Sequence, residues 1–199
     1  MIKNILIGTV IALGMTGCTS MADTMSKAAG LGVVSQEKST FDNATIISVS
    51  PTFLYTKGSW GNSIKLGARW SSKSPEYVAL ILAYDSSITS SSTAYLSLTG
   101  IDINIDGEIS SHSTGSPTNL DSSGYNSVSK NIYTSSQNTV VIPYTLLERM
   151  VSAKDCRLRI QTGKGYEDSE FSIERIPGGQ GTAILSIKEF MAKVSATRG

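Results

Sequence analysis

Oxygen-bearing side chains alternate with isoleucines at one point in the chain. Asp102, Asn104 and Asp106 are spaced two residues apart, and Gly107 follows them directly. Calcium binds oxygen ligands that come from alternate positions of a loop, and a glycine allows such a loop to turn sharply. These residue types at this spacing therefore suit the coordination of a hard cation.

The eight residues DINIDGEI that begin at Asp102 resemble the start of the calcium loop in the EF-hand and dockerin families, which reads D-x-N-x-D-G-x-I. The resemblance implies that Asp102, Asn104 and Asp106 would bind calcium through their side chains, and Glu108 through its backbone carbonyl. At the twelfth position those families carry a carboxylate, whereas this chain has Ser113.

The same residues also fit a β-hairpin. Ile103 and Ile105 continue the two-residue period of a strand, which places Asp102 and Asn104 together on its other, exposed face. Asp-Gly is a favoured pair for the two-residue turn of a hairpin, so the turn would lie at residues 106–107. The sequence leaves both the calcium loop and the hairpin open.

A second group of charged side chains lies in the last quarter of the chain. Its members are Glu167, Asp168, Glu170 and Glu174, with Arg157, Arg159 and Arg175. Two carboxylates that flank a glycosidic bond can hydrolyse it. Carboxylates at alternating positions opposite arginines instead form cross-strand ion pairs. An envelope hydrolase and a set of ion pairs are the two interpretations of this group.

The N-terminus has the three-part layout of a secretory signal. Lys3 precedes an apolar run over residues 5–13, and small residues follow up to Cys18. The run is shorter than the ~20 residues that a helix needs to span a bilayer. The four residues MTGC that end at Cys18 resemble the lipobox of bacterial lipoprotein signal peptides.

This resemblance implies cleavage before Cys18, acylation of that cysteine and attachment of the protein to a membrane by its acyl chains. In the lipoprotein family, an aspartate directly after the cysteine retains the protein at the inner membrane. This chain has Thr19 there, so the resemblance implies the outer membrane, and we expect the domain on its periplasmic side.

The charge balance argues against a nucleic-acid partner. The chain has 17 Lys and Arg residues and 16 Asp and Glu residues. Because residues 1–17 contain only the charge of Lys3, their removal leaves a formally neutral protein. Nucleic-acid binding needs a clustered positive surface, and the basic residues are not clustered.

The remaining cysteine and the single histidine predict no further chemistry. Cys156 alternates with arginines in a strand-like segment, so we expect a buried thiol without a disulfide partner if Cys18 is acylated. His112 lies among serines in what we expect to be a solvated loop. A zinc site or a Ser-His-Asp triad requires more partners than this surrounding sequence offers.

The chain divides into three parts. Residues 1–17 are expected to form the signal peptide, and residues 18–40 the acylated cysteine and a flexible tether with a short helical turn. Residues 41–199 are expected to form a single β-rich domain.

Alternating apolar residues predict strands through most of this domain, and the phase of the alternation shifts by one residue at Gly100, which predicts a β-bulge. The expected fold is mainly β, an antiparallel sandwich of about eight strands with two short helices, one of them C-terminal. An α+β arrangement is the alternative. The serine-rich residues 110–138 are expected to form long loops or an irregular hairpin.

These features predict a non-enzymatic binding or structural module of the cell envelope, with an envelope protein or glycan as its partner. The candidate contact surface combines residues 110–138 with Tyr55, Trp60, Tyr125 and Tyr133. An envelope hydrolase and a calcium-dependent adhesion module are the alternatives. No cofactor is expected apart from the calcium that the Asp102 segment would bind.

Overall fold

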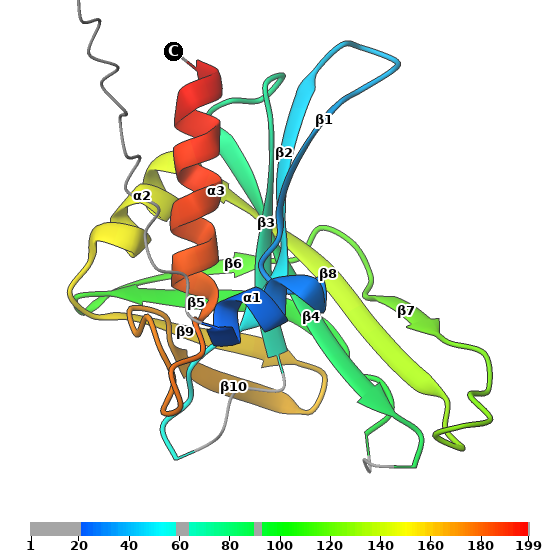
Figure 1. The fold of residues 1–199 in the computed structure, drawn as a ribbon. Coiled ribbons are helices and arrows are strands. Elements are labelled where there is room, and N and C mark those ends of the chain that lie inside the picture. Colours follow the sequence, from blue (N-terminus) through cyan, green and yellow to red (C-terminus); the bar gives the residue numbers. More distant parts are fainter. Residues whose placement is uncertain (1–20, 59–63, 90–92, 199) are drawn as a thin grey trace, which may run out of the picture.

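A computed structural model describes residues 21–58, 64–89 and 93–198, and these residues form ten strands and three helices (Figure 1). The larger sheet has the order β1 (Val34–Lys38), β2 (Thr45–Phe53), β3 (Ile64–Ser71), β4 (Tyr77–Ser87), β8 (Tyr133–Pro143), β7 (Asn119–Ser122). The smaller sheet has the order β10 (Gly165–Glu170), β9 (Cys156–Thr162), β5 (Leu98–Ile105), β6 (Glu108–Ser113). The helices are α1 (Met21–Ala28), α2 (Tyr144–Ser152) and α3 (Ala183–Arg198).

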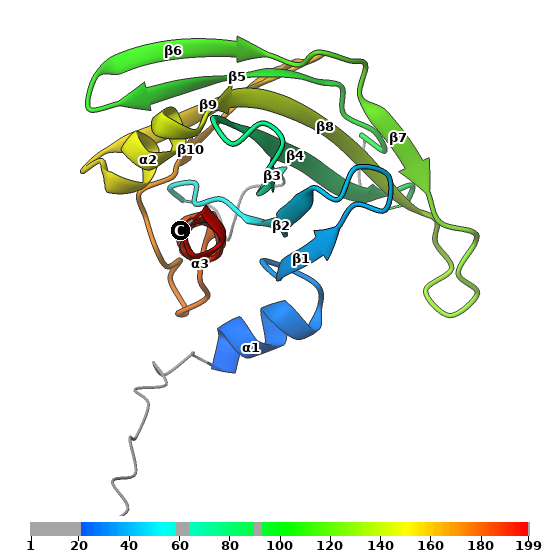
Figure 2. The same ribbon diagram turned by 90° about the horizontal axis from the view of Figure 1, so that it is seen from above.

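Every strand pairing in the two sheets is antiparallel among the described residues, which confirms the mainly antiparallel β fold with a C-terminal helix. The smaller sheet and α3 lie on the same side of the larger sheet (Figure 2). Their apolar side chains merge into one core, to which α3 contributes Ile184, Ile187, Phe190 and Val194. Within the described residues, no helix combines the length and the apolar character that crossing a membrane requires.

The flexible tether that we predicted for residues 18–40 is wrong over most of residues 21–38, and the short helical turn expected within it is helix α1. Helix α1 and strand β1 both lie within it, and β1 pairs with β2 along its whole length, from Val34 opposite Val49 to Lys38 opposite Thr45. Strand β1 is an edge strand with exposed polar side chains on both faces. Such a strand has no alternating apolar pattern, so periodicity cannot reveal it.

Of the two predictions for residues 110–138, the long loops are largely wrong, whereas β7 and β8 pair as a hairpin, in agreement with the alternative. This region contains β6, β7 and the first half of β8. The inward positions of β8 are buried, but three of them are polar: Thr134, Ser136 and Asn138, which we call the polar stripe. Because the apolar alternation begins only at Val140 and Ile142, the sequence predicts a strand half as long as the real one.

The side chains of the polar stripe on β8 form hydrogen bonds with the backbone at the start of β5. The side-chain amide of Asn138 donates hydrogen bonds to the carbonyls of Leu98 (2.8 Å) and Ser116 (3.0 Å). The hydroxyl of Ser136 accepts a hydrogen bond from the backbone N–H of Leu96 (3.0 Å). A buried polar side chain is stable only when its hydrogen bonds are made, so these residues hold the smaller sheet in place through side chains.

The β-bulge predicted at Gly100 is confirmed. The register between β5 and β9 shifts between Leu98 and Gly100. A Cβ atom at position 100 would lie 2.7 Å from the carbonyl oxygen of His112, which is closer than real contacts allow. The glycine therefore permits the neighbouring strand β6 to approach at the point where the apolar face of β5 is restored.

Asn138→Ala tests the role of the polar stripe. The substitution leaves the carbonyl of Ser116 without its side-chain donor and the carbonyl of Leu98 with only the hydroxyl of Thr118, so we expect the free energy of unfolding to fall by about 1–3 kcal/mol. Gln137→Ala is the matched control, because Gln137 is exposed on the other face of the same strand, and it should change stability by less than about 0.5 kcal/mol. Urea unfolding measures both, and equal effects would contradict this role.

Candidate functional site

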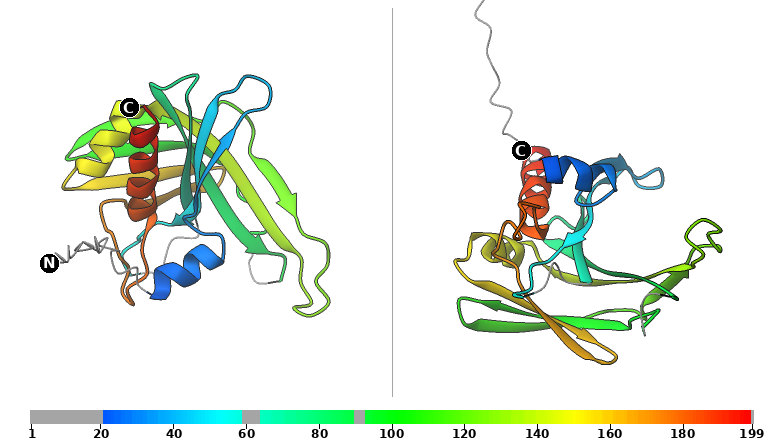
Figure 3. Two further views of the ribbon diagram at one scale, coloured as in Figure 1. Left: turned by 45° about the horizontal axis from the view of Figure 1, so that its top comes forward. Right: turned by 60° about the horizontal axis from the view of Figure 1, so that its bottom comes forward.

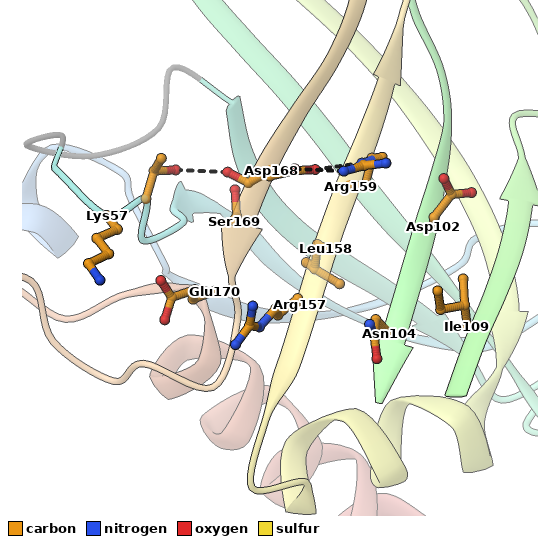
Figure 4. Close-up of a pocket in the computed structure, with 11 residues that line it drawn as sticks. Lys57, Asp102, Asn104, Ile109, Arg157, Leu158, Arg159, Asp168, Ser169 and Glu170 are labelled. Carbon is orange, nitrogen blue, oxygen red and sulfur yellow. Dashed lines mark hydrogen bonds and ion pairs between the residues drawn. The ribbon is translucent and has the colours of Figure 1, made fainter. Parts of the chain in front are cut away.

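A groove crosses the outward face of the smaller sheet, on the side away from the core (Figure 4). Its volume is about 450 Å³. Strands β10, β9, β5 and β6 line it together with Lys57, which follows β2. Its charged and amide side chains are Lys57, Asp102, Asn104, Arg157, Arg159, Asp168 and Glu170.

The two-residue period of the strands produces this groove. On β9, Cys156, Leu158 and Ile160 are buried in the core, whereas Arg157 and Arg159 are exposed on the other face. The neighbouring strands alternate in the same way, so the antiparallel register aligns their outward side chains in rows across the sheet.

The central row contains Arg159 between two carboxylates, Asp168 of β10 and Asp102 of β5. Arg159 donates two hydrogen bonds to Asp168, at 2.7 and 2.9 Å. Asp102 accepts a hydrogen bond from the side chain of Gln161 (2.6 Å). The guanidinium carbon of Arg159 also lies 4.0 Å from the ring centre of Tyr166. This arginine is thus held by a bidentate ion pair and an aromatic ring at once.

The ion pair keeps both of its members charged. The hydrogen bonds from Arg159 lower the pKa of Asp168, because they stabilise the ionised carboxylate. The same contact raises the pKa of Arg159. Both side chains are about half exposed to solvent, so the pair contributes little to overall stability. Its main effect is to fix the shape and the charge of the groove wall.

The next row contains Glu170, Arg157 and Asn104 from three adjacent strands. Arg157 forms an ion pair with Asp155 at 3.0 Å, and this contact raises the pKa of Arg157. A backbone hydrogen bond holds Tyr55, two residues before Lys57, at the edge of β10: the N–H of Glu170 donates to the carbonyl of Tyr55 (2.9 Å). Residues from five separate segments therefore meet in one groove.

The predicted group of carboxylates and arginines divides in the structure. Asp168 and Glu170 line the groove, and the pair between Asp168 and Arg159 has the cross-strand geometry that the ion-pair interpretation expects. Glu174 instead pairs with Lys188 of α3 (2.6 Å), and Arg175 pairs with Asp23 of α1 (2.9 Å). Glu167 lies on β10 but is not among the residues that line the groove.

The hairpin predicted as one of the two interpretations of residues 102–109 is confirmed. Strands β5 and β6 pair as far as Ile105 and Glu108, and the turn between them has positive φ angles of 50° at Asp106 and 100° at Gly107. Two positive φ angles are typical of the type I′ turn that Asp-Gly favours. Ile103 and Ile105 are buried in the core, and this burial holds the segment in its extended form.

The four residues proposed as calcium ligands have separate partners. The side chain of Asn104 accepts from the N–H of Gly107 (2.9 Å), and that of Asp106 accepts from the N–H of Asp155 (3.0 Å). Glu108 forms an ion pair with Arg149, and Asp102 is held by the amide of Gln161, as described above. Among the residues that the structure describes, no three His, Cys, Asp or Glu side chains are grouped to hold a metal ion.

The aromatic residues of the proposed contact surface differ in their exposure. Tyr125 and Tyr133 are exposed at the β7–β8 connection, whereas Tyr55 is half-buried beside β10. Trp60 and the lipidation residue Cys18 lie outside the described residues. The sequence shows alternating polar positions on β5 and on β9, but it gives no signal that these two strands pair to form the groove.

Cys156 and His112 take no part in the groove. Cys156 is fully buried, as predicted, and burial raises the pKa of its thiol to about 12. A thiol that stays protonated is a poor nucleophile. His112 lies on the edge strand β6 rather than in a loop, and its Nε2 atom is 3.2 Å from the hydroxyl of Ser110.

No protein-family model, no curated protein and no solved structure matches this chain.

Asp168→Asn tests the ion pair through the pH dependence of stability. A carboxylate whose pKa is lowered on folding stabilises the protein above its unfolded pKa of about 3.9, and this contribution disappears as the pH falls. We expect the variant to be less stable by about 0.2–1 kcal/mol at pH 7, and the difference to close below about pH 4.

Urea unfolding between acidic and neutral pH measures this difference. Asp121→Asn, on the edge strand β7 outside the groove, is the control for removing a carboxylate. A difference for Asp168→Asn that persists at low pH would contradict an electrostatic origin.

Proposed function

We propose that this protein is a lipid-anchored binding protein of the bacterial cell envelope. In this proposal Cys18 carries the acyl chains that attach it to the periplasmic side of the outer membrane. The groove on the smaller sheet binds a polar envelope ligand without a chemical step. The observation that supports this function is the groove itself, in which polar side chains from four segments converge and two hydrogen bonds hold Arg159 against Asp168.

The chemistry of the groove suits a ligand that carries hydroxyl, carboxylate and amine groups together. Lys57 and Arg157 are donors that favour carboxylates, whereas Asp102 and Glu170 are acceptors that favour hydroxyls and amines. Peptidoglycan presents all of these groups, on its glycan strands and on its stem peptides. We therefore propose peptidoglycan as the ligand class.

The charges in the groove favour a ligand whose hydrogen-bonding groups match the positions of these side chains, rather than a ligand attracted by an overall positive or negative potential. Positive and negative side chains alternate across the central row, from Asp168 through Arg159 to Asp102. Such a row does not attract a polyanion from a distance. It discriminates among ligands by the positions of their hydrogen-bonding groups.

At Asp168, binding is better supported than hydrolysis. A glycosidase of the common type needs one carboxyl group with a raised pKa, which donates a proton to the leaving group. Asp168 has the opposite shift, because Arg159 stabilises its ionised form. This carboxylate suits the acceptance of hydrogen bonds from a ligand.

Co-sedimentation with purified peptidoglycan sacculi tests the proposal. The double variant Asp102→Ala and Arg157→Ala removes one acceptor and one donor from the groove. We expect its dissociation constant to rise at least about tenfold relative to the unmodified protein. Arg149→Ala is the matched control, because Arg149 is an exposed arginine of α2 that pairs with Glu108 and does not line the groove.

Thermal unfolding must show that both variants remain folded. Equal sedimentation of the groove variant and the control would contradict a role for the groove. A protein that does not sediment with sacculi at all would contradict the ligand class. Degradation of the sacculi would instead support the hydrolase alternative.

A further inference from the structure

Helix α1 is tied to the domain by the carboxylate of Asp23. Arg175 donates to both oxygens of Asp23, at 2.9 and 3.3 Å, and the N–H of Gly181 donates to one of them (2.8 Å). The side chain of Gln180 also donates to the hydroxyl of Ser26 (3.1 Å). These contacts join α1 to the loop before α3, which is more than 150 residues away in the sequence.

The C-terminal end of α1 is fixed as well. Gly30 has a φ of +80°, and the N–H of Leu31 donates back to the carbonyl of Ser26 (2.9 Å), as in a Schellman motif. The hydroxyl of Ser50 in β2 donates to the carbonyl of Gly30 (2.6 Å), and Lys27 forms an ion pair with Glu189 of α3 (2.7 Å). Helix α1 therefore moves with the domain rather than as a loose tail.

The face of α1 that points away from Arg175 and Gly181 is exposed and carries two methionine side chains. Met21 is 81% exposed and Met25 is 68% exposed. Residues four apart lie on one face of a helix, so the two methionines form a single apolar strip with Ala28. Asp23 and Ser26, which face the domain, lie on the other side. The helix is amphipathic, and its apolar side faces away from the protein.

The sequence position of α1 indicates what covers this strip. Cys18 precedes Met21 by three residues, which span at most about 11 Å of fully extended chain. If Cys18 carries acyl chains in the outer membrane, α1 must lie close to the bilayer surface. An amphipathic helix at that position places its apolar face among the lipid headgroups.

We propose that α1 lies on the bilayer with Met21 and Met25 inserted at its surface, and that its attachment to Arg175 and Gly181 thereby sets the orientation of the whole domain. This inference rests on the lipid anchor of the proposed function. It goes beyond that function because a flexible tether would allow every orientation, whereas a docked helix allows one.

The orientation of the domain on the bilayer determines the direction in which the groove faces. Helix α1 and strands β5 and β6 lie on opposite sides of the molecule, with α3 and the core between them (Figures 2 and 3). The groove is on the outward face of the smaller sheet, so it faces away from α3 and from α1. With α1 on the membrane, the groove is turned toward the periplasm, where peptidoglycan lies.

Spin labels on the full-length acylated protein test this orientation in vesicles of phosphatidylethanolamine and phosphatidylglycerol. Met25→Cys places a label on the proposed contact strip, and Val128→Cys places one on the β7–β8 connection, where Val128 is 92% exposed. Cys156 is buried and should not react, so each variant carries one label. Collisions with a water-soluble nickel chelate measure the exposure of each label to water.

We expect nickel accessibility at position 25 to fall at least about threefold when the protein is reconstituted, and accessibility at position 128 to stay constant. A third label at Ile109, which lines the groove, should also stay accessible. Unchanged accessibility at position 25 in protein that floats with the vesicles would overturn the docking of α1. Shielding at position 109 would overturn the orientation.

Flotation of the vesicles separates this inference from the proposed function. Protein that carries no acyl chains and does not float would contradict the lipid anchor itself. Protein that floats, but whose label at position 25 behaves like the label at position 128, would leave the anchor intact and contradict only the contact of α1 with the bilayer.

Discussion

The hydrogen bonds of the polar stripe determine how the two sheets are placed. Within the described residues, the two sheets share no backbone ladder, and one isolated bridge joins Tyr55, which follows β2, to Glu170 of β10. Side chains therefore make most of the contacts that set the relative position of the sheets. Apolar packing in the common core stabilises the arrangement but is not directional. The contacts of Ser136 and Asn138 with the backbone at Leu96 and Leu98 are directional, and they fix where β5 begins. The groove depends on this placement, because β5 provides one of its walls.

Two opposite surfaces follow from the same core. In the smaller sheet, the apolar side chains that point inward are buried in the core. Because side chains alternate along a strand, the polar residues between them point outward and line the groove. The loop before α3 binds α1 on the other side of the molecule through Asp23. The core thus lies between an exposed apolar strip on α1 and a polar groove on the smaller sheet.

The sequence predicted the β class, the bulge at Gly100, the buried thiol of Cys156 and the C-terminal helix, because each produces a local periodic signal. It did not predict the full length of β8, where buried Ser136 and Asn138 interrupt the apolar pattern.

The groove was beyond sequence analysis for a different reason. Its central row joins Asp102, Arg159 and Asp168, and only the register of three strands brings these residues together. The sequence indicated the ion pair between neighbouring strands β9 and β10, but not the approach of β5 or of Lys57. Register across a sheet is set by turns and by core packing, which a single sequence does not show directly.

Photo-crosslinking in intact bacteria tests most directly whether the groove is the binding surface. A photoreactive phenylalanine replaces either Ile109, which is 66% exposed in the groove, or Val141, which is 60% exposed on β8 of the larger sheet. We predict a crosslinked product that muramidase digestion reduces in size from position 109, and none from position 141. A product from position 141 alone, or equal products from both, would contradict the assignment of the groove.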